Sequence, residues 1–303
     1  MDILKITYSG VTTSISLYIE NDTLVCGAAS ISLTTYDTIA KLKTELEKIT
    51  GITATILNSS SAFLCSKINE ISRYFPAEVV GTGVYLSYDN YSSPKQVCET
   101  FSVPYANIVN SWFDNADNII TAQTGGFKFK EITETLTIDV HSDMLKTNDK
   151  YINKYGLFYV EYNELYLPEY SPIQSVSSLS IDGTSVTYTT LITTYNSIIL
   201  TSSSEVSSFV EGQDKVAITF NYGYPKTSSY GVIASQLATY IIYDNLINYV
   251  SSGTQGLKPI TATHSSLVLK EEGDKDYSQG VTNRQHIRSL LSGLPKKINM
   301  RVI

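Results

Sequence analysis

The hydrophobic pattern of the first ninety residues predicts a small mixed unit of strands and one helix. Apolar and polar residues alternate in three runs, as in strands with one buried face: 3–9, 14–21 and 28–36. Segment 38–51 instead places apolar residues at helical spacing, with Gly51 where a helix would end: Ile39, Leu42, Leu46 and Ile49. A further strand follows at 52–57. We therefore expect a β-β-α-β unit that ends between residues 58 and 92, with a short helix at 61–74.

A second pattern begins after the turn-rich segment 88–95 and predicts a helix at about 104–123. Pro104 suits its first turn, and Gly125-Gly126 would stop it. Its apolar stripe is predicted to contain Ile108, Trp112, Ala116, Ile119 and Ile120. We expect Trp112, the single tryptophan, to be a core anchor; an exposed interface position is the alternative.

From 127 to 222 nearly every run alternates, which predicts a large antiparallel β-domain. Asp182-Gly183 is a hairpin turn between two such runs, whereas polar residues 141–156 predict a loop. After Pro225, apolar spacing predicts a helix at about 228–250. An extended arm follows, and a last helix begins near Thr282 and ends at Pro295.

These elements predict an α+β protein with three parts. They are an N-terminal β-β-α-β accessory domain (1–92), a helical core interrupted by the inserted β-domain (93–281), and a C-terminal helix with its tail (282–303). The length of 303 residues is sufficient for two real cores.

Composition favours large subunit contacts over a freely diffusing, highly charged protein. Charged residues are only 17% of the chain, against about 25% in typical domains, and 23 tyrosines help to supply the polar surface. The net charge of -7 argues against non-specific binding to DNA or to anionic membranes.

Cysteine content and the amino terminus indicate a protein made in a reducing cytoplasm. Cys26, Cys65 and Cys98 are odd in number and have no CxxC spacing, so we expect buried thiols rather than disulfides or a zinc site. No signal peptide and no apolar run of membrane-spanning length is present, and we expect a soluble protein.

Residues able to carry chemistry are few. His141, His264 and His286 lie in no metal-binding or catalytic spacing, and phosphate-binding glycine motifs are missing. Two weak metal candidates remain. The first is Asp139 and Asp143 beside His141; the second is the acidic turn at 270–276, which lacks the order of an EF-hand. We predict no enzymatic activity, no catalytic residue, no cofactor and no metal.

The carboxyl-terminal segment is the one local concentration of positive charge. Arg284, Arg288, Lys296, Lys297 and Arg301 alternate with apolar residues of an amphipathic helix: Ile287, Leu290, Leu291 and Leu294. Two interpretations stay open. The helix docks onto an acidic partner, or it packs on its own domain with a solvated cationic face.

The order of several short motifs resembles the head–tail adaptor proteins, also called head-completion or connector proteins, of long-tailed bacteriophages. The motifs are a glycine turn before an aromatic strand, a Leu-Pro, a Pro-Ile-x-Ser-Val stretch, an Asp-Gly-like hairpin and a V-x-I-x-Y-x-x-G-Y strand. They fall at Gly125–Phe129, Leu167-Pro168, Pro172–Val176, Asp182-Gly183 and Val216–Tyr224. The later arm matches at Ser266, Gly273, Asp274, Tyr277 and Ser278. The resemblance covers residues 104–303. It departs at the glycine turn, where many relatives carry Arg, and in length, because relatives are usually shorter.

The resemblance implies a structural virion protein of the neck, assembled in the host cytoplasm. Relatives form a homo-oligomeric ring, usually of twelve copies, between the portal protein and the stopper or tail, and the genome passes through the ring without specific binding. By this analogy the portal-docking residues are Arg284, Ile287, Arg288, Leu291, Lys296, Lys297 and Arg301. The alternatives are a tail-completion or tail-associated virion protein, for which six copies are expected, and a carbohydrate- or surface-binding β module.

Overall fold

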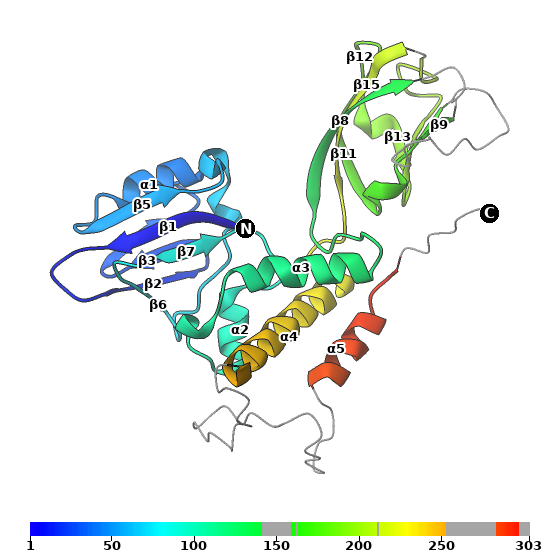
Figure 1. Cartoon of the computed structure of the whole chain (residues 1–303). Coiled ribbons are helices and arrows are strands. Elements are labelled where there is room, and N and C mark those ends of the chain that lie inside the picture. Colours follow the sequence, from blue (N-terminus) through cyan, green and yellow to red (C-terminus); the bar gives the residue numbers. More distant parts are fainter. Residues whose placement is uncertain (141–158, 162, 211, 253–282, 297–303) are drawn as a thin grey trace. The chain divides into compact units, whose positions relative to one another are not determined.

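The chain is a mixed α+β protein with five α-helices and several antiparallel sheets among the residues that the structure describes (Figure 1). This computed structural model describes residues 1–140, 159–161, 163–210, 212–252 and 283–296. Met1–Ala122 and Ile233–Leu294 form one compact unit, and Gln123–Val232 belongs to a second. The predicted α+β class is confirmed. The predicted division at residues 92 and 281 separates the chain into other parts than these two units, and it stays a prediction.

Two small antiparallel sheets and α1 (Ile39–Leu46) build the amino-terminal part of the first unit. One sheet has the order β5-β1-β7, with bounds Ile52–Ile56, Asp2–Tyr8 and Val84–Ser87. The other has the order β4-β3-β2-β6, with bounds Ala29–Ser32, Thr23–Cys26, Ile15–Glu20 and Ala77–Val79. Three residues of the predicted α1 stripe, Ile39, Leu42 and Leu46, are fully buried. The helix ends at Leu46, earlier than the predicted end at Gly51, and Ile49 lies beyond it and is half-buried.

The predicted helix at 61–74 is wrong. The segment instead forms two 3₁₀ turns, η1 (Ser60–Ala62) and η2 (Cys65–Lys67), followed by extended chain. Ile71 forms an isolated bridge with Ile19, and Ile68 forms one with Tyr88, while Leu64 is 47% exposed. Pairing with neighbouring strands therefore satisfies backbone groups that a helix would have satisfied internally.

An unpredicted helix, α2 (Pro94–Phe101), begins inside the segment that sequence patterning assigned to a boundary. Ser93 caps it, since its Oγ accepts a hydrogen bond from the Gln96 amide at 3.2 Å, and Pro94 occupies the first turn. After a 3₁₀ turn, η3 (Tyr105–Asn107), α3 (Ser111–Gln123) begins later than the predicted residue 104.

The buried face of α3 is shifted from the predicted stripe. Phe113, Ala116 and Ile120 are completely buried, whereas Trp112 is half-buried and Ile119 is 39% exposed. Trp112 is therefore not the core anchor that the sequence predicted. Its indole lies edge-on to Tyr249 at 6.0 Å, and Tyr249 is itself 66% exposed.

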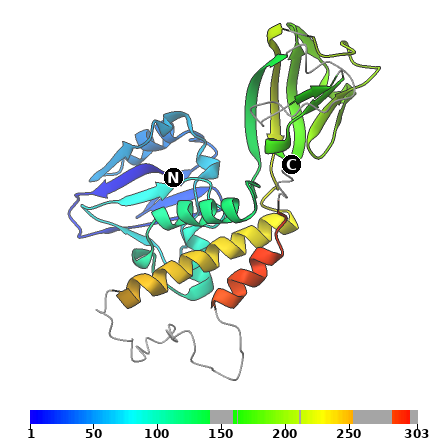
Figure 2. The same ribbon diagram turned by 45° about the vertical axis from the view of Figure 1, so that its right-hand side comes forward.

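The long helix α4 (Ser229–Ser252) lies between α3 and α5 (Asn283–Ser292) in both ribbon views (Figure 1, Figure 2). It confirms the predicted helix at 228–250. Its buried residues cover a wide arc: Ala234, Leu237, Ala238, Thr239, Ile241, Ile242 and Leu246. Side-chain hydrogen bonds of 2.8 Å join Thr239 to Ser92 and Ser235 to Gln96, and Phe101 stacks on Tyr243 at 3.8 Å.

Two four-stranded antiparallel sheets form the second unit. The order β12-β11-β15-β8 has bounds Thr184–Val186, Ile173–Ile181, Gly212–Tyr222 and Ile132–Val140. The order β13-β14-β10-β9 has bounds Leu191–Thr193, Ser197–Leu200, Glu164–Tyr166 and Tyr159–Glu161. Short 3₁₀ turns occur at η4 (Pro168–Tyr170) and η5 (Tyr188–Thr190). The predicted hairpin is confirmed, since β11 pairs with β12 and Asp182 and Gly183 have φ of 50° and 76°.

Gly223 closes the second unit where β15 ends. Its φ is +95°, its amide donates to the Pro172 carbonyl at 2.8 Å, and the next amide, of Tyr224, donates to the Lys128 carbonyl at 2.8 Å. A Cβ at Gly223 would lie 2.3 Å from the Lys130 carbonyl oxygen. The end of β15 and the segment that leads into β8 therefore meet at this glycine.

Phe113→Ala should lower the free energy of unfolding by about 3–5 kcal/mol because it empties a completely buried site on α3. Trp112→Ala should cost only about 1–2 kcal/mol, because that ring is half-buried. Urea unfolding followed by circular dichroism measures both values without depending on tryptophan fluorescence. A larger loss of unfolding free energy for Trp112→Ala than for Phe113→Ala would contradict the assignment of Phe113 to the buried face of α3.

Gly223→Ala should destabilise the second unit, because the added methyl meets backbone as well as an unfavourable φ. Gly126→Ala is the matched control: its φ is +101°, but nothing lies within 4 Å of the added Cβ. The control should cost about 1–2 kcal/mol, and Gly223→Ala about 1–3 kcal/mol more. Equal midpoints in urea unfolding of the two variants would show that the close approach is absent.

Candidate docking surface on helix α5

Helix α5 forms where the carboxyl-terminal pattern predicts it and packs on α4. Asn283 Nδ2 donates to Asp244 Oδ1 at 3.1 Å. The ring centroids of His286 and Tyr240 are 4.2 Å apart. Leu294, just beyond the helix, is only 4% exposed. A Cβ at Gly293 would lie 3.7 Å from Ile233 Cδ1, which is ordinary contact distance.

The residues predicted to dock a partner divide into two groups. Arg284, Arg288 and Lys296 are exposed, while Ile287 and Leu291 are half-buried. Lys297 and Arg301 lie outside the described residues. The two interpretations that the sequence left open are therefore compatible, because one helix packs on its own chain and also displays cationic side chains.

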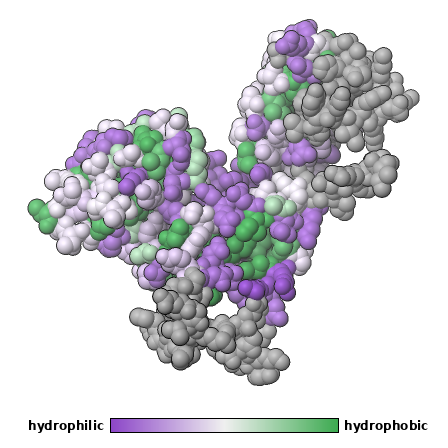
Figure 3. Space-filling model, in the orientation of Figure 1, coloured by the Kyte–Doolittle hydropathy of each residue, from purple (hydrophilic) through white to green (hydrophobic). Residues whose placement is uncertain are grey.

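Apolar surface remains visible on the helices of the first unit. In Figure 3 hydrophobic atoms gather over the region of α3, α4 and α5, with hydrophilic atoms around them. Ile119 of α3 is 39% exposed, and Ile233 of α4 and Leu290 of α5 are half-buried. An apolar patch with a polar rim is typical of a protein-interaction site.

Two buried polar atoms at α4 and α5 lack hydrogen-bond partners. They are Nδ2 of Asn245, a donor, and Oδ1 of Asn283, an acceptor. An unsatisfied buried atom costs about 1–3 kcal/mol. Because Asn283 lies at the contact with α4, its unpartnered Oδ1 makes that contact less favourable than its apolar part alone suggests.

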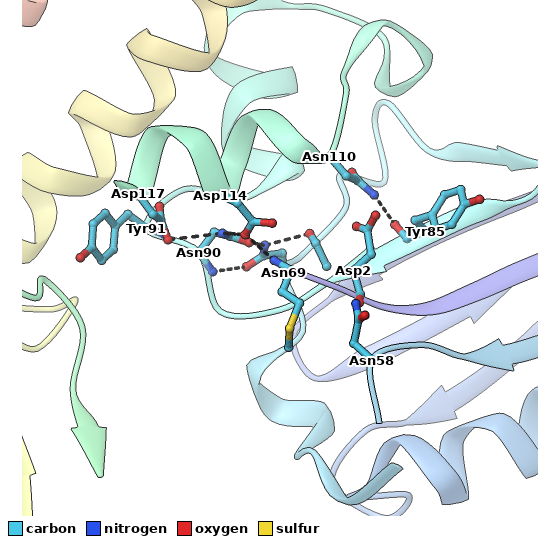
Figure 4. Close-up of polar contacts among 11 residues, drawn as sticks. Asp2, Asn58, Asn69, Tyr85, Asn90, Tyr91, Asn110, Asp114 and Asp117 are labelled. Atoms are coloured by element: carbon cyan, nitrogen blue, oxygen red, sulfur yellow. Dashed lines mark hydrogen bonds and ion pairs between the residues drawn. The ribbon is translucent and has the colours of Figure 1, made fainter. Parts of the chain in front are cut away.

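A polar cluster in the first unit joins the strand end at Ser87 to α3 (Figure 4). Asn69 Nδ2 donates to Asn90 Oδ1 at 2.9 Å and to Ser87 Oγ at 3.0 Å. Asn90 Nδ2 in turn donates to Asp114 Oδ1 at 2.8 Å, and the Tyr91 amide donates to Asp117 at 3.0 Å.

The Met1 ammonium also pairs with Asp114. These groups satisfy one another, so the cluster positions α3 rather than presenting reactive groups. Hydrophobic patterning does not reveal this cluster, although Asp114 and Asp117 are spaced as neighbours on one helix face.

Asp2 lies beside this cluster and is the titratable group of interest there. Burial raises the pKa of its carboxyl, and the Met1 ammonium and a hydrogen bond from Asn110 oppose that shift. In contrast, the hydrogen bond from Lys95, 2.9 Å away, lowers the pKa of Glu20. The two carboxyls therefore contribute to stability with opposite signs.

The cysteines are free and buried, and burial raises the pKa of the thiols, to about 11 for Cys26 and about 12 for Cys65 and Cys98. Thiols with such values stay protonated at neutral pH and are poor nucleophiles.

The weak metal candidates find no further support. His141, Asp143, His264 and the acidic turn at 270–276 lie outside the described residues, and Asp139 is half-buried at the end of β8. Within the described ranges, no three His, Cys, Asp or Glu side chains gather as metal ligands would. The absence of enzymatic activity stays a prediction.

No helix in the described part of the chain is both long enough and apolar enough to span a membrane.

Comparisons of the chain with protein-family models and with curated proteins give no match. The resemblance to head–tail adaptors therefore rests on the order of motifs in the sequence and stays a prediction.

Asp2→Asn should raise the melting temperature near pH 7. A raised folded-state pKa means that ionisation of Asp2 costs stability above that pKa, and that the cost vanishes below the unfolded-state pKa. The gain should therefore disappear at about pH 3. Glu20→Gln should do the opposite at pH 7, since it removes a carboxylate stabilised by Lys95. Thermal unfolding across pH measures both, and a gain from Asp2→Asn that persists at pH 3 would contradict the burial of this carboxyl.

Proposed function

We propose that this protein is a structural head–tail adaptor of a tailed bacteriophage, which forms a ring between the portal and the stopper or tail and leaves a channel for the genome. The observation that carries the proposal is α5, which packs on α4 with Ile287 and Leu291 half-buried and leaves Arg284 and Arg288 exposed. A helix that carries exposed cations and half-buried apolar side chains suits an acidic protein partner.

The order of the elements supports this proposal. The chain leaves the helical elements after α3, forms the antiparallel β unit, and returns through α4. The resemblance implies a helical core with an inserted β-domain, and this order of elements supports that arrangement. The segment 1–92 is then an accessory domain, with a role as spacer or decoration on the ring.

The net charge favours a channel through which DNA passes, rather than a DNA-binding site. With a net charge of -7, the protein repels the phosphate backbone overall. In this proposal Arg288 and Lys296 contact the portal protein, and the genome moves past without specific contacts. In this proposal the protein links the portal to the stopper or tail in the virion neck and catalyses no reaction.

Charge reversal on α5 tests the docking surface. Arg288→Glu combined with Lys296→Glu should weaken binding to the portal protein at least tenfold, because each attraction becomes a repulsion. Lys67→Glu, an exposed cation far along the sequence, is the control and should bind as the unmodified chain does. Point changes are preferable to truncation, since removal of Leu294 would uncover apolar surface. Normal portal binding by the double variant would show that α5 does not dock.

Electron microscopy of the purified protein with and without portal protein tests the assembly itself. A closed ring of twelve copies is the expected result. A ring of six would favour the tail-completion alternative, and a protein that stays monomeric in both samples would overturn the proposal.

A further inference from the structure

Helix α5 is connected to α4 by far more chain than their contact requires. Asn283, the first residue of α5, bonds to Asp244, which lies eight residues before the end of α4 at Ser252. Eight helical residues span about 12 Å, a gap that about four extended residues can cross. The sequence instead places residues 253–282 between the helices, and extended chain of that length can reach about 100 Å.

The contact between α4 and α5 is also small enough for α5 to leave one copy of α4 and pack on another. Among the described residues of this carboxyl-terminal segment, Leu294 alone is buried, and the apolar residues Ile287, Leu290 and Leu291 are half-buried. Asn283, whose Nδ2 bonds to Asp244, leaves its Oδ1 buried without a hydrogen-bond partner. A short helix with so small a buried face gains little from staying with one particular copy of α4.

We propose that neighbouring copies of this chain exchange α5, so that the α5 of one copy packs on the α4 of the next. The inference rests on the self-assembly part of the proposed function. Exchange needs no new surface, because the same side chains meet in either arrangement, and it is a low-cost route to an oligomer. A helix passed on in one direction around a closed assembly covers the apolar face of every α4.

Exchange preserves the cationic side of α5. Arg284 and Arg288 are exposed while α5 lies on α4 in one chain, and the same packing on a neighbouring α4 would keep them on the side of α5 that faces away from α4. An exchanged ring would therefore repeat the cationic surface around its axis while it links each copy to the next. The length of the connection between α4 and α5 allows α5 to reach a neighbouring copy, and packing on α4 fixes where α5 lies.

Paired single-cysteine chains test the exchange. Ile233→Cys in one chain and Gly293→Cys in a second chain with a different tag are co-expressed, assembled and treated with a short thiol crosslinker. The modified positions are in contact range, since a Cβ at 293 would lie 3.7 Å from Ile233 Cδ1. We expect a covalent dimer that carries both tags. The native thiols are buried, so the unmodified protein should give no such band.

A chain that carries both substitutions provides the matched control. Exchange predicts a ladder of covalent oligomers from it, whereas packing within one chain predicts a crosslinked monomer. Asp244→Cys with Asn283→Cys is a second pair at the same contact. Crosslinked monomers from both pairs, or no link from either, would overturn the exchange. Rings that persist in the microscope with either result would leave the adaptor proposal standing, so the two proposals fail separately.

Discussion

The burial of α4 is the constraint on which the first unit depends. Its apolar residues cover so wide an arc that one neighbour cannot shield them, and a helix of this kind must be surrounded. The amino-terminal part supplies Ser92, Gln96 and Phe101, and the carboxyl-terminal part supplies α5. Segments that precede and follow the β unit in the sequence therefore meet on α4.

Elements with a clear period could be predicted from the sequence, and elements defined by tertiary contacts could not. α1, α4 and α5 follow their apolar spacing, and the Asp182-Gly183 hairpin follows turn chemistry. The segment 61–74 has helical spacing, yet it forms two 3₁₀ turns, and bridges from Ile68 and Ile71 hold its later part extended. On α3 the stripe was misplaced because Phe113 and Trp112 are adjacent, and periodicity cannot decide which one faces inward.

The candidate site shows the same division. The sequence located the cationic helix and its residues, because charge and spacing are local properties. It could not decide which side of the helix is covered, since that depends on α4, about forty residues earlier along the chain. The polar cluster of Asn69, Asn90 and Asp114 is another such case, in which ordinary polar residues of loops and a helix become informative only when brought together.

The hydrogen bond between Tyr224 and Lys128 has a consequence for the history of the chain. It holds the two ends of the β unit side by side, so that this unit enters and leaves the rest of the protein at one point. A segment with adjoining ends can be gained, lost or replaced as a whole without a change in the helices that precede and follow it. The β unit can therefore be replaced as one piece, and its surface residues can change in evolution while the helical part keeps its packing.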